Sequence, residues 1–285
     1  MVDIVYRNND LLPLFGERKQ LGGTAYEWRV ATAANSSTEI FTEGSAQPTA
    51  VAQTYAMATL AWVYYRAMVR VTGHLKDAIR GMAVPDQFNV ILQEYTLAAE
   101  DIRDLMNTTN MGTGNNGLQL AIDSAGTYAA INRSTTAAWG SFEDAQAVSH
   151  ANLMTMRRTV RDAERGGKPD IFIVNPTEEQ AIQNLVGAPN AQNTSVRYDT
   201  TASAGRLQLA PLVGGTRFGE IAVVGVPDFT ADILLCFQRS DVTHVIHREM
   251  EERPDQSGDD DLVQISVAST LVHRNPRRAG KFTSF

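Results

Sequence analysis

The longest unbroken pattern in this sequence is an amphipathic helix over residues 85 to 112. Apolar side chains recur there at steps of three and four residues, which places them on one stripe of a helix with 3.6 residues per turn. The stripe consists of Phe88, Ile91, Leu92, Tyr95, Ala98, Ala99, Ile102, Leu105 and Met106. Asp86 is placed to cap the first turn, and Gly112 with Gly114 ends the helix. At 1.5 Å per residue the helix is about 35 Å long, so other parts of the chain must cover its stripe.

Strand patterns precede this helix. Residues 24 to 32 alternate between Tyr26, Trp28 and Val30 on one face and charged or small residues on the other. From 55 to 71 the alternation predicts a return strand, which at about 3.3 Å per residue would span on the order of 55 Å. A ribbon of that length is an aggregation hazard when exposed, so we interpret it as an arm that reaches a neighbouring subunit.

The remaining segments mix helices with strands. Residues 1 to 21 have no sustained period and are predicted to form an extended arm. A second helix is predicted at 143 to 165, and Thr177 is expected to cap a third one after the apolar strand at 171 to 174. The last strands are predicted at 221–226, 233–237, 242–250 and 262–272. This mixture of helices and mostly antiparallel strands predicts an α+β fold.

Composition excludes several classes of function. The chain has 285 residues, 43% of them hydrophobic, which suits one or two domains with a substantial core. Its net charge of −7 argues against a high-affinity nucleic-acid reader, which would normally carry a basic patch. No signal peptide is visible and no apolar run approaches the ~20 residues of a membrane helix, so we expect a reducing, aqueous compartment. Cys236, the sole cysteine, lies in an apolar run and is predicted to be a buried hydrophobe.

No motif supports catalysis. Residues 112–117 match G-x-G-x-x-G, but they follow the end of a helix, where the dipole has the wrong sign for a phosphate. His244 and His247 are three residues apart on a predicted strand, so they point to opposite faces and do not form a metal-binding pair. The acidic run at 255–261 lacks the ligand order of an EF-hand and is predicted to be a solvated turn, with an ion between subunits left open. We therefore predict no catalytic, cofactor-binding or metal-binding residues.

The order of the segments carries more information than any motif. The stretches concerned are 94–104 running into 112–117, then 117–123, 131–134 with Trp139, 170–176, 270–276 and 280–282. With the arm, the ribbon and the closing strands, their order and spacing resemble the major capsid proteins of tailed bacteriophages with the Hong Kong 97-type fold. The resemblance covers essentially the whole chain.

The resemblance implies a role for each region. The expected regions are an N-terminal arm at 1–21, an E-loop at 22–75 lying over the adjacent subunit, a P-domain at 76–167 with its spine helix at 86–111, an A-domain at 168–240, and a return to the P-domain at 241–285. The turn that starts at Arg253 is expected near threefold contacts between capsomers.

The resemblance also implies the function. We expect a major capsid protein that self-assembles through hexamers and pentamers into an icosahedral shell enclosing phage double-stranded DNA, without sequence-specific binding. The expected location is the virion, assembled in the host cytoplasm without a membrane. Expected partners are further copies of the chain, a portal, a decoration or cement protein and a separate scaffolding protein, since residues 1–21 leave no room for a fused scaffold.

One departure from the type member concerns covalent crosslinking, which uses an E-loop lysine, a neighbour's asparagine and a catalytic glutamate. No lysine occurs between Lys19 and Lys76, and residues 262–272 contain no carboxylate. We therefore expect a shell held non-covalently.

The residues expected at contacts between subunits are aromatic anchors and a charged rim. In the arm and E-loop they are Phe15, Arg18, Tyr26, Glu27, Trp28, Arg29, Glu39, Phe41, Glu43, Trp62, Tyr64, Arg66 and Arg70; at the threefold turn they are Arg253, Asp255 and Asp259. Trp62 and Tyr64 could equally pack within their own subunit.

Two other functions stay open. An encapsulin, a cellular compartment with the same fold, would enclose an enzyme cargo, but residues 1–21 lack the amphipathic helix that lines a cargo site. A soluble enzyme is the less favoured alternative, because no active-site constellation is present.

Overall fold

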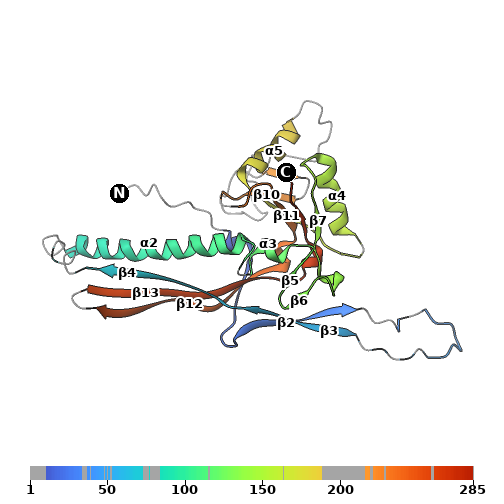
Figure 1. Ribbon diagram of the computed structural model, residues 1–285, viewed down its shortest axis with the longest axis horizontal. Coiled ribbons are helices and arrows are strands. Elements are labelled where there is room, and N and C mark those ends of the chain that lie inside the picture. Colours follow the sequence, from blue (N-terminus) through green and yellow to red (C-terminus); the bar gives the residue numbers. More distant parts are fainter. Residues whose placement is uncertain are drawn as a thin grey trace.

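The computed structural model of the chain describes residues 11–33, 37–38, 40–47, 49, 51, 53–72, 77, 84–114, 116–162, 164–187, 216–218, 221–227, 229–257 and 260–284. They form a four-stranded sheet beside one long helix, a six-stranded sheet with two shorter helices, and a projecting hairpin (Figure 1). Most strand pairs are antiparallel, which confirms the α+β class.

The four-stranded sheet is built on a long hairpin near the C-terminus. Its strands lie in the order β1 (Gly16–Lys19), β12 (Val242–Ser257), β13 (Asp260–His273) and β4 (Val63–Val71). β12 and β4 are both antiparallel to β13, whereas β1 is parallel to β12. The strands predicted at 242–250 and 262–272 are present, and both continue further toward their common turn.

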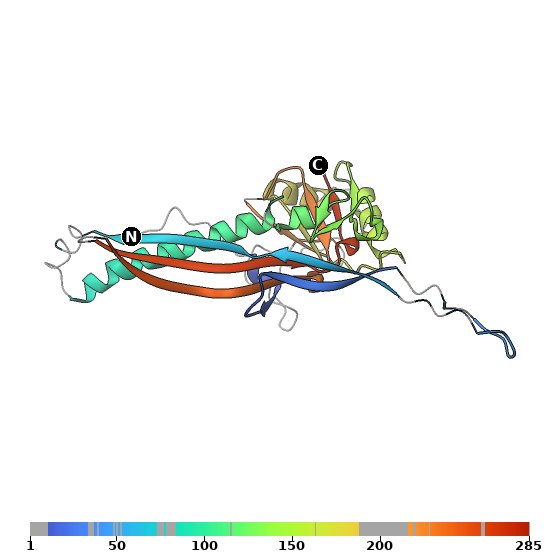
Figure 2. The same cartoon turned by 60° about the horizontal axis from the view of Figure 1, so that its bottom comes forward.

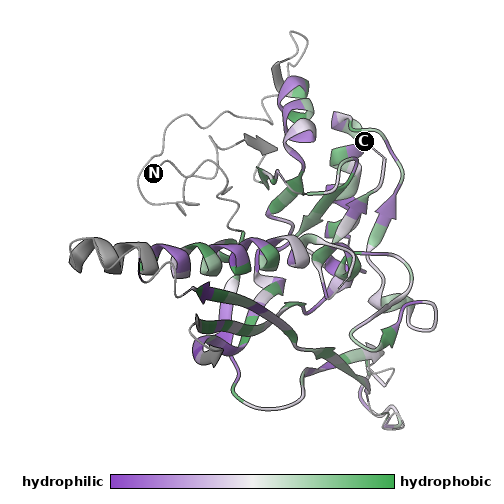
Figure 3. Cartoon of the chain, turned by 60° about the vertical axis from the view of Figure 1, so that its left-hand side comes forward, coloured by the Kyte–Doolittle hydropathy of each residue, from purple (hydrophilic) through white to green (hydrophobic). Residues whose placement is uncertain are grey.

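Helix α2 (Val84–Met111) lies along this sheet and confirms the long predicted helix (Figures 1 and 2). Figure 3 shows hydrophilic and hydrophobic bands alternating along it. Ile102 and Met106 are buried against β4 and β13. Leu92 and Leu105, predicted on the same stripe, are instead 63% and 52% exposed. The buried stripe is therefore narrower than predicted, because only one sheet covers the helix.

The start of α2 also differs from the prediction. The helix begins at Val84, so Asp86 lies inside it rather than at its cap. Pro85 then occupies the first turn, where a missing backbone N–H leaves no helical hydrogen bond unmade. The helix ends directly before Gly112, as predicted.

The six-stranded sheet forms the second part of the fold. Its order is β7 (Phe142–Asp144), β14 (Gly280–Phe282), β11 (Leu234–Phe237), β8 (Ile171–Val174), β10 (Ile221–Gly225) and β9 (Thr216–Phe218). All four residues of β8 are fully buried, because both faces of the sheet are covered. Phe172 and Val174 pack with helices α4 (His150–Arg161) and α5 (Pro176–Gly187). Ile171 and Ile173 pack with Leu11 and with the end of α2.

Two local predictions around these helices were wrong. The helix predicted at 143 to 165 is limited to α4, because residues 142–144 pair with β14 as strand β7. Ser149 caps α4 by accepting a hydrogen bond from the N–H of Asn152. The third helix is capped by Asn175 rather than Thr177, since the Asn175 side chain accepts the N–H of Thr177 at 3.1 Å.

The hairpin of β2 (Ala25–Ala33) and β3 (Thr54–Ala61) projects from the body (Figure 2). The return strand predicted at 55 to 71 is broken at Trp62. Residues up to Ala61 pair with β2, whereas β4, on the other side of Trp62, pairs with β13 in the body. The ribbon is therefore shorter than predicted, because half of the return strand belongs to the four-stranded sheet.

Short elements connect these parts. They are η1 (Leu12–Leu14), α3 (Leu118–Ala121), β5 (Thr127–Tyr128), β6 (Ile131–Asn132), η2 (Ala137–Trp139), η3 (Arg239–Asp241) and η4 (Pro276–Arg278). Cys236 is buried, as predicted. Among the described helices, none has the length and apolarity needed to cross a membrane.

Candidate assembly surfaces

The described part of the N-terminal arm is attached to its own chain. Leu11 and Phe15 are 1% and 5% exposed within the core beside the six-stranded sheet. Lys19 forms an ion pair with Glu249, and β1 extends the sheet beside β12. Phe15 is therefore not available to a neighbouring copy, which corrects its prediction as a contact, whereas Arg18 is exposed.

The root of the hairpin is a cluster of aromatic rings. The rings of Trp62 and His247 are stacked with centroids 4.6 Å apart, and the Trp62 indole N–H donates to the Gly23 carbonyl at 3.0 Å. Tyr26 lies edge-on to Trp62 at 6.4 Å. Tyr26 is 3% exposed, so little of it is left to contact another copy. Trp62 is 5% exposed and packs within its own chain, which is the alternative left open for it. Trp28 is half-buried in the same cluster.

Beyond its root, the hairpin presents unburied side chains. Glu27, Arg29, Phe41 and Glu43 are exposed, so they remain free to meet another copy. Glu39 lies outside the described residues. Four further apolar side chains, which were not predicted as contacts, are also exposed: Ile40, Val51, Tyr55 and Met57. The alternation of residues 54 to 61 places Tyr55 and Met57 on one face of the strand. This pattern could have predicted that the two side chains are exposed together.

The outer face of β4 is a second exposed surface. Tyr65 and Val69 point toward α2 and are buried, so alternation directs Tyr64, Arg66, Met68 and Arg70 outward. Tyr64 is 63% exposed. Trp62 therefore packs inside its own chain, whereas Tyr64 is exposed and remains a candidate for a contact with another copy.

The predicted threefold turn is only partly described. Arg253 is exposed on β12 and lies 3.5 Å from Glu251. Asp255 pairs through its backbone with Leu262, and Asp259 lies outside the described residues. In the part of the chain that the structure describes, no three His, Cys, Asp or Glu side chains are grouped to hold a metal ion.

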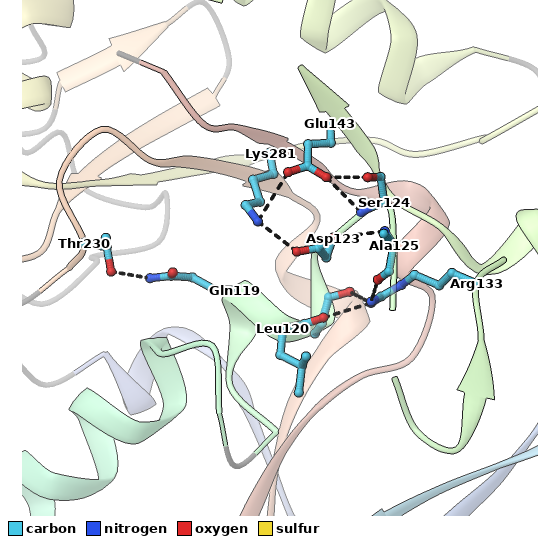
Figure 4. Close-up of polar contacts among 10 residues, drawn as sticks. Gln119, Leu120, Asp123, Ser124, Ala125, Arg133, Glu143, Thr230 and Lys281 are labelled. Atoms are coloured by element: carbon cyan, nitrogen blue, oxygen red, sulfur yellow. Dashed lines mark hydrogen bonds and ion pairs between the residues drawn. The ribbon is translucent and has the colours of Figure 1, made fainter. Parts of the chain in front are cut away.

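An ion-pair network fastens three segments at the centre of the fold (Figure 4). The Lys281 ammonium on β14 lies 2.9 Å from Asp123 and 3.5 Å from Glu143 on β7. Glu143 also accepts hydrogen bonds from the N–H and hydroxyl of Ser124. Burial alone would raise the pKa of Asp123, but hydrogen bonds from the Ala125 N–H and the Lys281 ammonium outweigh it and hold that pKa below its ordinary value. The network is structural, since each charge has a partner.

Arg133 supports the same region from below the network. Its guanidinium donates to the carbonyls of Leu120, Ala121 and Ala125 at 2.7 to 2.9 Å (Figure 4). It thereby occupies carbonyl groups that the end of the short helix α3 leaves unpaired. The sequence pattern gave no signal for this role, which depends on contacts within the folded chain.

Solved structures share this arrangement. The capsid asymmetric unit of cyanophage A-1(L) is similar with a TM-score of 0.76 and 16% identity, over 100% of this chain and 95% of that one. The capsid of a native GTA particle has a TM-score of 0.65 and 10% identity, over 100% and 93%. The SrpI encapsulin of Synechococcus elongatus PCC 7942 has a TM-score of 0.68 and 9% identity, over 99% and 89%. These likenesses define the class: the chain has the Hong Kong 97-type fold of shell-forming subunits.

The family is more specific than the fold. Residues 2–285 match the SU10 major capsid protein family, and the chain belongs to it. It is a major capsid protein of a bacteriophage and a component of the virion. No curated protein matches the sequence.

Proposed function

We propose that this major capsid protein assembles through hexamers and pentamers into an icosahedral shell that encloses double-stranded DNA. The observation that carries this proposal is the family match over residues 2–285, together with apolar side chains left exposed on the projecting hairpin. An exposed hairpin with Phe41, Tyr55 and Met57 on its surface favours a neighbouring copy as its cover.

The regional roles belong to the same proposal. We assign residues 1–21 to the N-arm and α2 to the spine helix, and we assign 168–240 to the A-domain. The break at Trp62 favours an E-loop of 22–61 rather than 22–75, because β4 is part of the sheet under the spine helix. Contacts between copies would then involve exposed side chains alone: Arg18, Glu27, Arg29, Phe41, Glu43, Tyr64, Arg66, Arg70 and Arg253.

A non-covalent shell fits the positions of the lysines. Lys19 is paired with Glu249, and Lys281 is paired with Asp123 and Glu143. Lys168 is exposed, but it lies far along the sequence from the hairpin. A lysine-based crosslink from the hairpin therefore has no donor in the described residues. We propose that the protein has no enzymatic activity of its own.

The partners beyond further copies of the chain are also proposals. A separate scaffolding protein, a portal and a decoration or cement protein would complete the particle, assembled in the host cytoplasm. The net charge of −7 suits a container that does not adhere to the DNA it encloses.

The test combines electron microscopy with denaturing gel electrophoresis of the purified, untagged protein. We expect closed shells that dissolve to a single band at the chain mass of 31.1 kDa. A ladder of larger bands would contradict the non-covalent shell. Persistent monomers or dimers, with no shells, tubes or capsomers under any assembly condition, would contradict the capsid proposal itself.

An encapsulin-type shell is the second candidate, favoured by the likeness to the SrpI encapsulin. Expression without other phage proteins separates the two. Shells that retain a specific host enzyme through purification would favour the encapsulin, whereas empty shells or shells filled only in the presence of a packaging system would favour the capsid.

A further inference from the structure

Helix α4 carries an exposed positive face. Leu153, Met156 and Val160 are fully buried against the six-stranded sheet. Helical spacing then places Met154, Arg158 and Arg161 on the opposite side. Both arginines are exposed and Met154 is 40% exposed.

The arginine face of α4 stands out in an acidic chain. With a net charge of −7, carboxylates outnumber cationic side chains, yet in the described part of the chain none forms an ion pair with Arg158 or Arg161. The face borders a hollow of about 850 Å³ whose lining includes Thr155 and Thr159. The same lining includes Asp162, which forms no ion pair with either arginine. An exposed apolar side chain followed along one helix face by two unpaired guanidinium groups is suited to a protein partner that presents an apolar side chain followed by carboxylates.

Helix α2 presents the matching face. Ile102 and Met106 are buried, and one flank of the helix beside this buried stripe carries Glu94, Asp101 and Leu105. The two carboxylates are exposed, and Leu105 is 52% exposed. This face therefore has the same design as that of α4, with charges of the opposite sign.

The spacing also agrees for the charged residue nearest the apolar side chain on each helix. Arg158 follows Met154 by four residues, and Asp101 precedes Leu105 by four, so each charge lies about 6 Å along its helix from the apolar residue. With Met154 against Leu105 and the helices antiparallel, Arg158 lies opposite Asp101. Arg161, seven residues from Met154, then lies opposite Ala98, about 6 Å along the helix from Glu94, a gap that two long side chains can span. Antiparallel helices also place opposite dipole ends together.

Within one chain these faces do not cover each other. α2 lies along the four-stranded sheet, whereas α4 covers the six-stranded sheet, and both outward faces are exposed (Figure 1). We propose that the face of α4 formed by Met154, Arg158 and Arg161 docks on the face of α2 formed by Glu94, Asp101 and Leu105 of a second copy. The inference rests on the proposed assembly of the chain into a shell.

Charge reversal tests the electrostatic half of this contact. Arg158→Glu with Arg161→Glu in the full chain is expected to lower the yield of shells by at least about tenfold, because attraction becomes repulsion at every repeat of the contact. Adding Glu94→Arg and Asp101→Arg should restore the yield. Lys168→Glu is the matched control, since Lys168 is exposed outside α4, and it should assemble as the wild type does. Thermal unfolding of each variant shows that it is folded.

A disulfide tests the contact directly. Met154→Cys with Leu105→Cys should give a ladder of covalent multimers on a non-reducing gel, and the native Cys236 does not interfere because it is buried. Met154→Cys with Leu92→Cys is the control, because Leu92 is exposed on another side of α2 and should not crosslink.

The outcomes separate this inference from the function on which it rests. Loss of shells on reversal, rescue by the second reversal and the expected ladder support the contact. Wild-type shell yield from the Arg158→Glu, Arg161→Glu variant overturns it, including the case in which only DNA retention falls and the arginines contact phosphates. Wild-type protein that forms no shells contradicts the proposed function itself.

Discussion

At the scale of single residues, His273 is the group whose burial has the clearest consequence. It lies at the end of β13, is 1% exposed, and neither ring nitrogen has a hydrogen-bond partner among the described residues. Burial, aided by the positive charge of Arg133, lowers the pKa of His273 to about 3. The side chain is therefore neutral throughout the physiological range, and its role is packing beside Phe237.

This pKa predicts acid lability. The folded pKa is below the unfolded value of 6.5, so the stabilisation is complete above about pH 6.5 and is lost as the pH falls toward 3. Between about pH 6.5 and pH 4, free subunits should lose about 3 kcal/mol of unfolding free energy through this group. Urea unfolding at the two pH values measures it. His273→Leu should remove most of this loss, and an unchanged pH dependence in that variant would contradict the assignment; His150→Gln on α4 is the control.

Lys281 makes a second prediction at this scale. Lys281→Met leaves the carboxylates of Asp123 and Glu143 facing each other without their cation. Because both are partly exposed, we expect a loss of about 2 kcal/mol rather than the larger cost of a fully buried pair. A thermal melt should show a midpoint lower by several degrees. Lys168→Met, at an exposed position, should leave the midpoint unchanged, and an equal fall in both variants would argue against the network.

At the scale of elements, the exposed face of the hairpin β2–β3 that carries Tyr55 and Met57 should act in assembly rather than in folding. Tyr55→Ser with Met57→Ser removes two side chains that are 56% and 51% exposed in the isolated chain. We expect an unchanged melting temperature, because no core contact is lost, and a reduced yield of shells. Met250→Ser on β12 removes a comparably exposed side chain as a control. A fall in melting temperature without an assembly defect would contradict this division of roles.

The elements also show how far the sequence alone reaches. The spacing of Ile102 and Met106 predicts α2, and the alternation around Tyr65 predicts β4. Both patterns can be recognised locally, because the apolar residues of each element repeat along its buried face. The break at Trp62 was not predictable in this way. Alternation continues on both sides of it, and only the partners change, from β2 to β13. Which strand pairs with which is decided by contacts between distant segments.

The residues proposed to contact other copies show the same limit of prediction from sequence. The sequence showed which strands carry aromatic residues. It did not distinguish Tyr26, which packs in the core of its own chain, from Tyr64, which is exposed. That difference depends on which sheet covers each face. Leu92 and Leu105 illustrate the converse, since residues predicted as core are exposed once the width of the covering sheet is known.

At the scale of the whole molecule, the root of the hairpin packs in the core, whereas residues 54–57 at the far end of β3 include the exposed side chains of Tyr55 and Met57. A two-stranded hairpin is marginally stable by itself. We expect amide hydrogen exchange in residues 54–57 to be fast in free subunits and slow in assembled shells, measured by mass spectrometry. Residues 171–174, which are fully buried in β8, serve as the reference and should be protected in both states. Fast exchange at 54–57 in closed shells would show that no neighbour covers this part of the hairpin.

The junction at Trp62 also has a mechanical consequence. The projecting β3 continues through one residue into β4, which is hydrogen-bonded to β13 over nine residue pairs from Val63 to Val71. Tension on the hairpin along the strand axis therefore loads those hydrogen bonds in shear, so that they share the force instead of opening one after another. A neighbouring copy bound to the hairpin would therefore transmit force to the four-stranded sheet that packs against α2. Pressure from tightly packed contents would then be borne by the longest strands of the subunit.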